Sequence, residues 1–141
     1  KWPNDLLINK KKICGILIES EVNGDAVEFI VGIGINYSLP KKESWWGEIG
    51  ELADILPREK LINSILQSII HYSENGYMDW KDAWEKRCMH MGIELEAVSN
   101  NQQNIELGIF NGINEEGKML LQTKNELKVI SSGECSIKGI Y

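Results

Sequence analysis

The run of residues 29–35, Phe-Ile-Val-Gly-Ile-Gly-Ile, constrains the fold more than any other part of this chain. Its side chains are apolar at odd and even positions alike, a pattern typical of a strand in mid-sheet with both faces covered. Successive side chains alternate between faces, so Gly32 and Gly34 share one face. Because glycine weakens a strand interior, the pair predicts that something closely approaches that face.

Two further strands are predicted ahead of this run, over 6–8 and 13–19. Turn residues separate the three segments at Asn9-Lys10-Lys11 and at Asn23-Gly24-Asp25. The basic run Lys10-Lys11-Lys12 is interpreted as part of a solvated hairpin turn, the usual meaning of a short charge run. The first third of the chain is therefore predicted to be sheet.

Two amphipathic helices are predicted after a polar loop that carries Trp45-Trp46. The first starts near Pro57, continues with apolar residues at helical spacing, and ends at Gly76. The second is capped by Asp79, extends through Cys88 and ends at Gly92. Both stripes of apolar side chains are interpreted as core.

The pattern changes after residue 92 to short alternating segments over 94–98, 105–110, 118–123, 126–130 and 135–138. Five short strands at this spacing predict a small antiparallel barrel. We place the boundary near residues 89–92, which gives a first domain over 1–90 and a second over 91–141.

Composition narrows the class of protein. The 141 residues are 43% hydrophobic, which suffices for a core, and their net charge of −6 argues against a general nucleic-acid-binding surface. Three cysteines without metal-ligand spacing favour a reducing cytoplasm, and no apolar stretch is long enough to span a membrane. Neither His71 nor His90 has a ligand or triad partner at suitable spacing, so no metal site is predicted.

Three blocks, in this order and spacing, resemble the biotin protein ligase family: Lys1-Trp2-Pro3-Asn4-Asp5, residues 12–19 (Lys-Ile-Cys-Gly-Ile-Leu-Ile-Glu) and residues 31–36 (Val-Gly-Ile-Gly-Ile-Asn). The tail resembles the family's final barrel at residues 112–117 and at Gly133-Glu134. The resemblance implies an α+β fold, namely the C-terminal part of a class II synthetase-like mixed sheet with covering helices, followed by a small Src-homology-3-like β-barrel.

The resemblance also implies an activity. Enzymes of this family condense biotin with ATP, with Mg²⁺, to biotinyl-5'-AMP, and then pass the biotinyl group to a lysine of a biotin carboxyl carrier protein. A cytoplasmic ligase is therefore expected. Two alternatives stay open: a non-catalytic remnant that serves as an interaction module, and a lipoate-type acyl ligase.

The lysine motif stands at position 1 with no initiator Met, and the family's Gly/Arg-rich loop has no counterpart in these residues. We therefore expect the C-terminal part of a longer enzyme that is inactive by itself. An open sheet edge and an uncovered apolar face would favour self-association, so a homodimer is one expectation. DNA binding is expected only if an N-terminal domain exists.

The resemblance assigns Lys1 as the catalytic cation that contacts the biotin carboxylate and the phosphate. Asn4 and Asp5 either hold a turn within the Lys1–Asp5 motif, through hydrogen bonds from their side chains to the backbone, or reach the nucleotide phosphates and Mg²⁺. Gly15, together with the two strand glycines, would let the backbone approach biotin and the acyl-adenylate, with a strand bulge as the alternative.

Further contacts are carried over from the family pattern. Ile35 and Asn36 would lie at the substrate, with Asn36 near the ribose and adenine or, alternatively, simply ending the strand. Trp46 would stack on adenine from a mobile loop, although Trp45 could take that role and a core-capping pair is the rival interpretation. Glu134 and Lys138 would face the ATP site from the barrel, and exposed strand positions would explain them as simply.

Overall fold

A computed structural model describes residues 1–40, 43–51, 56–99, 104–133 and 135–138. Its contacts divide the chain into two compact units, which are described one at a time. The first contains the described residues of Asn4–Gly76, and the second contains Lys1–Pro3 with the described residues from Tyr77 onward. Neither helix of the described chain combines the length and the apolar character needed to cross a bilayer.

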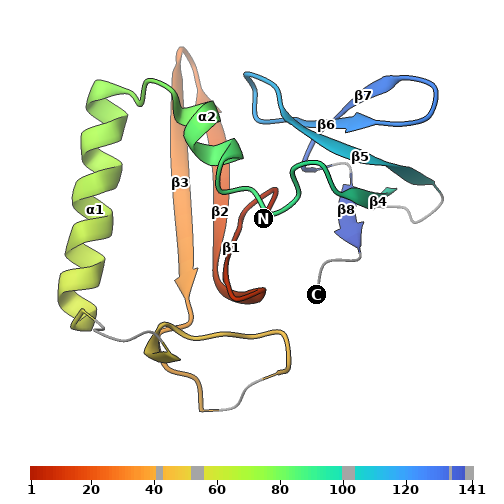
Figure 1. The fold of residues 1–141 in the computed structure, drawn as a ribbon. Helices are drawn as coiled ribbons and strands as arrows, with labels where there is room; N and C mark the ends of the chain where they lie inside the picture. The colour runs from red at the N-terminus through yellow and green to blue at the C-terminus, as the bar shows by residue number, and fades with distance from the viewer. Residues whose placement is uncertain (41–42, 52–55, 100–103, 134, 139–141) are drawn as a thin grey trace. The chain divides into compact units, whose positions relative to one another are not determined.

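The first unit is built on a three-stranded antiparallel sheet in the order β1-β2-β3 (Figure 1). The strands are β1 (Asp5–Ile8), β2 (Lys11–Asn23) and β3 (Ala26–Ile35). Both predicted turns are confirmed: Asn9 and Lys10 have left-handed φ angles of 50° and 65°, and Gly24 has a φ of 63°. Gly24 suits such a turn because it carries no Cβ that would clash at positive φ, and asparagine, as at Asn9, tolerates that conformation better than most residues.

The prediction of a covered mid-sheet strand is wrong for β3. Of the described strands only β2 pairs with it. Phe29 and Ile30 are 67% and 62% exposed, although they point to opposite faces of the sheet. Strand β3 therefore has two apolar faces, as predicted, but the described residues do not cover them.

Helix α1 (Arg58–Asn75) begins directly after Pro57 and ends at Gly76, whose φ is 68°, close to the predicted limits. It lies alongside the sheet (Figure 1). None of its residues is buried, and a cavity of about 430 Å³ separates its apolar stripe from Ile33 and Ile35 of β3. The expected core between helix and sheet is thus only partly formed. The loop between β3 and α1 contains a short 3-10 helix, η1 (Ile49–Glu51).

The second unit starts with α2 (Trp80–Glu85), which is shorter than predicted. Asp79 precedes it in a left-handed conformation without a side-chain cap, and Cys88 lies in the turns that follow. All five predicted strands are present, in the order β7-β6-β5-β4-β8 with antiparallel pairing. They are β4 (Glu94–Ser99), β5 (Ile105–Ile113), β6 (Met119–Gln122), β7 (Leu127–Ile130) and β8 (Cys135–Lys138). Among the described residues no pairing joins β7 to β8.

The core of this unit gathers around Trp2, Phe110, Met119 and Leu121, each at most 2% exposed. The indole Nε1 of Trp2 donates a hydrogen bond to the carbonyl oxygen of Gly117 at 3.0 Å. Trp2 is therefore a core residue of the five-stranded unit. The expected boundary near residues 89–92 stays a prediction, since the contacts group α2 and Lys1–Pro3 with these strands.

Candidate functional site

Three predicted glycines meet on one face of the first unit. The strand register sets Gly15 opposite Gly34, and Gly32 opposite Leu17. The bare backbone at these positions forms the floor of an open hollow of about 610 Å³. Its other lining residues are Asn4, Asp5, Lys12, Ile16, Leu17 and Ile33.

The hollow exists because these strand positions carry no side chain. A Cβ added at Gly34 would meet nothing closer than the carbonyl oxygen of Gly15 at 3.9 Å, and one added at Gly32 would lie 3.7 Å from the carbonyl oxygen of Leu17. Both are ordinary van der Waals distances, so the fold itself does not require glycine at either position. A ligand that approaches this backbone would require it.

Asn4 is held by two hydrogen bonds to one residue. Its Nδ2 donates to the carbonyl oxygen of Ile16 at 2.7 Å, and its own carbonyl oxygen accepts from the Ile16 N–H at 2.9 Å. These contacts favour the interpretation in which Asn4 fixes the start of β1. Its amide can still border the hollow, because the side chain lines it.

Asp5 forms an ion pair with Lys12, with 2.6 Å between Oδ1 and Nζ. The Asp5 side chain is 13% exposed and that of Lys12 is 32% exposed. The described residues contain no cluster of three or more His, Cys, Asp or Glu that could hold a metal ion. Asp5 is thus a carboxylate with a cationic partner at the edge of this hollow.

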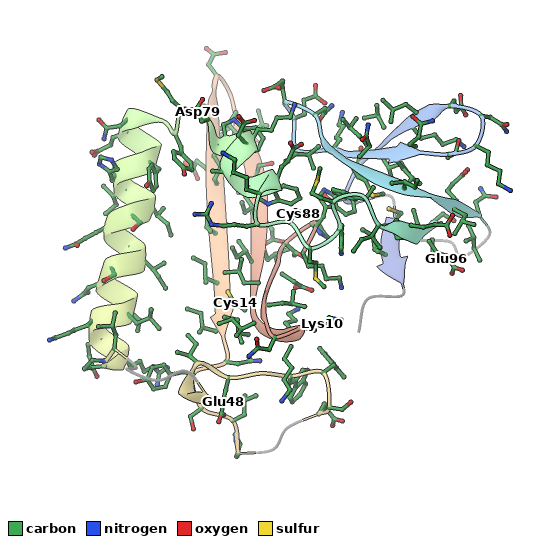
Figure 2. The ribbon with its side chains drawn as sticks, in the orientation of Figure 1. Lys10, Cys14, Glu48, Asp79, Cys88 and Glu96 are labelled. Carbon is green, nitrogen blue, oxygen red and sulfur yellow. The ribbon has the colours of Figure 1, made fainter. Side chains whose placement is uncertain are left out.

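Lys12 is the site residue that sequence reasoning missed. The predicted hairpin is present, and Lys10 lies exposed at its turn (Figure 2). The pairing of β1 with β2, however, shifts register between Leu6 and Leu7, which leaves Ile13 without a partner on β1. Such a bulge interrupts the alternation of side chains. The Lys12 ammonium consequently lies over Gly15, 3.3 Å from where a Cβ would be.

The backbone of the same lysine anchors the loop that carries the two tryptophans. The Lys12 N–H donates to the carbonyl oxygen of Trp45 at 3.0 Å, and its carbonyl oxygen accepts from the Gly47 N–H at 2.9 Å. The Asn36 amide donates to the carbonyl oxygens of Lys12 and Gly47 at 3.1 and 3.0 Å. Both donors of Asn36 are therefore used by the backbone, which supports its strand-ending interpretation.

Trp45 and Trp46, the two candidates for stacking on adenine, do not stack face to face on one another. The Trp45 and Trp46 rings contact edge to face, with centroids 5.3 Å apart. Trp45 is 42% exposed and Trp46 is half-buried. The loop that carries these tryptophans was expected to be mobile. It contains two pieces of regular structure, namely a β-bridge between Lys12 and Trp46 and the short helix η1.

Of the other predicted residues, Ile35, Asn36 and Trp46 do not line this hollow. Ile35 lies on the opposite face and lines the cavity under α1. Lys1 belongs to the second unit, and Lys138 contributes to β8, where its backbone pairs with Glu96; neither unit is placed relative to the other. Glu134 lies outside the described residues.

Two buried titratable groups have shifted pKa values. Burial, together with the positive charges of the amino group of residue 1 and of Lys1, lowers the pKa of His90 to about 4. Burial raises the pKa of the Cys14 thiol, which the nearby Lys12 partly offsets and Asp5 reinforces. A thiol with a raised pKa is less often the reactive thiolate, so burial does not activate Cys14 as a nucleophile.

Comparisons with known proteins point to one family. Residues 1–36 match the model of the biotin/lipoate A/B protein ligase family, and residues 90–138 match that of the biotin protein ligase C-terminal domain. The bifunctional ligase/repressor BirA of Bacillus spizizenii is 33% identical over 97% of this chain. The biotin--[acetyl-CoA-carboxylase] ligase of Paracoccus denitrificans is 28% identical over 99% of it.

Solved structures of the Aquifex aeolicus biotin protein ligase are also similar. The apo form has 26% identity and a TM-score of 0.77, and the complex with biotin and ATP has 26% identity and a TM-score of 0.76. Each alignment covers 97% of this chain and 63% or 60% of the solved chain. The chain spans 45% and 62% of the two curated relatives. From these matches and the motif glycines around the hollow, the chain belongs to the biotin protein ligase family.

Proposed function

We propose that the complete natural protein carrying this sequence activates biotin with ATP to biotinyl-5'-AMP and then transfers the biotinyl group to a lysine of a biotin carboxyl carrier protein. The observation that carries the proposal is the hollow over Gly15, Gly32 and Gly34, bordered by Lys12 and Asp5. The relatives' names and the Aquifex aeolicus complex with biotin and ATP support the choice of substrates.

Adenylation needs a site of this kind. The biotin carboxylate attacks the α-phosphorus of ATP while pyrophosphate leaves, so negative charge gathers at one centre and fixed cations stabilise it. The bare strand backbone gives room for the acyl-adenylate, and Leu17, which faces Gly32, offers apolar surface beside it. The hollow thus combines polar and apolar parts, as the mixed anhydride of an apolar acid requires.

Other members of the proposed site come from the family resemblance. Lys1 is assigned to the biotin carboxylate and the phosphate, Ile35 and Asn36 to the substrate, and Trp46 to adenine. Glu134 and Lys138 are assigned to the ATP side. Replacing Lys1 with Ala should lower the adenylation rate by about 10²- to 10³-fold, the usual loss for one preorganised charge-stabilising group.

Mg²⁺ is proposed to enter with ATP. It prefers oxygen ligands and commonly takes one or two protein carboxylates together with substrate phosphates. Asp5 is the carboxylate at this hollow, and its Oδ1 already faces the Lys12 ammonium. The residues present therefore fit an ion held mainly by the nucleotide. A cytoplasmic location is part of the same proposal, since ATP and the carrier are expected there.

Self-association is a secondary proposal. One edge of β3, with which no described strand pairs, and the exposed Phe29 and Ile30 support it, because unpaired edges and apolar faces favour strand addition. Light scattering of this chain over a wide concentration range should show a mass that grows with concentration. A constant monomer mass would contradict it.

The test of the proposed activity is exchange of labelled pyrophosphate into ATP by the complete protein. Exchange should require biotin, and lipoate should not replace it. A protein that exchanges with lipoate alone would belong to the lipoate-type alternative. One that binds biotin without any exchange would be an interaction module.

A further inference from the structure

We propose that Lys12 is a second fixed cation of the acyl-adenylate site, that it contacts the phosphoryl group, and that Asp5 is the positioning residue that holds it there. This inference rests on the proposed function and adds a residue to it. The ligand class is a mixed anhydride between a carboxylic acid and a nucleoside monophosphate. The lysine that the family resemblance singles out is Lys1, not Lys12.

Geometry puts the ammonium against Gly15, at the polar side of the hollow. Its Nζ would lie only 3.3 Å from a Cβ on Gly15, which is closer than ordinary van der Waals contact. Gly15 in turn faces Gly34 across the two strands. A ligand lying on this bare backbone would therefore come within reach of Nζ without any rearrangement of the strands.

The lysine is also well fixed, as a preorganised group must be. Its N–H and carbonyl oxygen bond to Trp45 and Gly47, and the bulge next to it sets the direction of the side chain. Asp5 then holds the ammonium at 2.6 Å. Flexible lysines lose side-chain entropy when they bind a ligand, and an ion pair that already restrains the side chain reduces that loss.

Lys12 retains capacity for a ligand. An ammonium has three N–H donors, and the contact with Asp5 needs one of them. In adenylation the carboxylate oxygen forms a bond to the α-phosphorus, the bond from that phosphorus to the bridging oxygen breaks, and its electron pair leaves with pyrophosphate. Lys12 gives and takes no proton in this step; it stabilises charge on the non-bridging oxygens.

The first test replaces Lys12 with Met in the complete natural protein, with Lys10→Met as the matched control. Lys10 lies at the exposed hairpin turn and does not line the hollow. Lys12→Met should lower biotin-dependent pyrophosphate exchange by about 10²- to 10³-fold. Lys12→Arg should recover part of the loss, and Lys10→Met should behave as wild type.

A binding measurement separates a phosphoryl contact from a merely structural role. Calorimetry should show that Lys12→Met weakens binding of biotinyl-5'-AMP about 10- to 100-fold, the worth of a hydrogen bond to a charged group, and leaves binding of biotin unchanged. Asp5→Asn should lower kcat of the exchange with little effect on KM for biotin, and Asp5→Glu should restore part of it.

The outcomes are distinguishable. If the wild-type protein shows no biotin-dependent exchange, the proposed function fails and this inference fails with it. If the wild type is active and Lys12→Met matches it, only the role of Lys12 is overturned. If Lys12→Met loses biotin and biotinyl-5'-AMP binding equally and melts at a lower temperature than Lys10→Met, the lysine is structural and the inference is again overturned.

Discussion

Gly34→Ala should separate ligand binding from folding in a single substitution. A Cβ at this position would lie 3.9 Å from the nearest heavy atom, the carbonyl oxygen of Gly15, and the φ of Gly34 is not left-handed. Replacing glycine by alanine where the backbone permits it stabilises a protein by about 0.4–1 kcal/mol, because the unfolded chain loses freedom. The melting temperature should therefore stay equal or rise.

Binding should change in the opposite direction. The added methyl group projects into the hollow, and a ligand that touches the strand backbone must move away from it. Overpacking of this kind costs about 1–3 kcal/mol. Since 1.4 kcal/mol is a factor of ten, biotinyl-5'-AMP should bind about 5- to 150-fold more weakly to the complete protein. Calorimetry measures the affinity, and thermal denaturation followed by circular dichroism measures the stability.

Gly24→Ala is the matched control, and it should lower stability while leaving ligand binding unchanged. It adds the same methyl group at the β2–β3 turn, where no atom lies within 4 Å but the φ is +63°. A non-glycine residue in that region costs about 1–2 kcal/mol. This variant should melt earlier and bind normally. If Gly34→Ala binds as tightly as wild type, the backbone of β3 does not meet the ligand, and the glycines are only features of the strand.

Three other predictions have equally specific outcomes. The lowered folded-state pKa of His90 means that the unfolded chain takes up a proton first as pH falls, so stability present above pH 6.5 should be lost towards about pH 4. His90→Leu should remove about 3 kcal/mol of this pH dependence in denaturant titrations. Gly108→Ala places a Cβ 2.7 Å from the carbonyl oxygen of Gln122 and should lower unfolding free energy by about 1–3 kcal/mol. The tryptophan fluorescence change on forming biotinyl-5'-AMP should disappear in Trp46→Ala and survive in Trp45→Ala.

Local sequence signals predicted most of the secondary structure. Glycines such as Gly24 and Gly76 favour turns whatever their tertiary surroundings, because they adopt positive φ without a clash. Both end the elements that they were expected to end. Alternation predicted all five strands of the second unit. The predicted length of the second helix was wrong. The helical spacing of apolar residues continues past Glu85, but there the Arg87 and Cys88 N–H groups donate to the carbonyl oxygens of Trp84 and Glu85, three residues back, and the α-helix ends.

The candidate site was less predictable, because a bulge and several long-range contacts decide it. Strict alternation would put Lys12 and Gly15 on opposite faces, and no local signal shows that Ile13 is passed over in the pairing with β1. Nor does sequence alone reveal that the Trp2 indole enters the core of the five-stranded unit. Gly32 and Gly34 were correctly predicted to share a face, because side chains alternate between the faces of a strand wherever no bulge intervenes.

Lys12 connects two parts of the site that the sequence presents separately. Its side chain borders the hollow, and its backbone holds the loop with the tryptophans through Trp45 and Gly47. A Cβ at Gly47 would lie 2.9 Å from Cβ of Lys11 and 3.2 Å from Cγ2 of Ile13, so glycine lets the loop lie directly against the start of β2. A displacement of the loop would therefore also move the backbone that carries the cation. If adenine binds this loop and the phosphoryl group binds Lys12, the two contacts share one stretch of backbone, and their binding energies should not be additive.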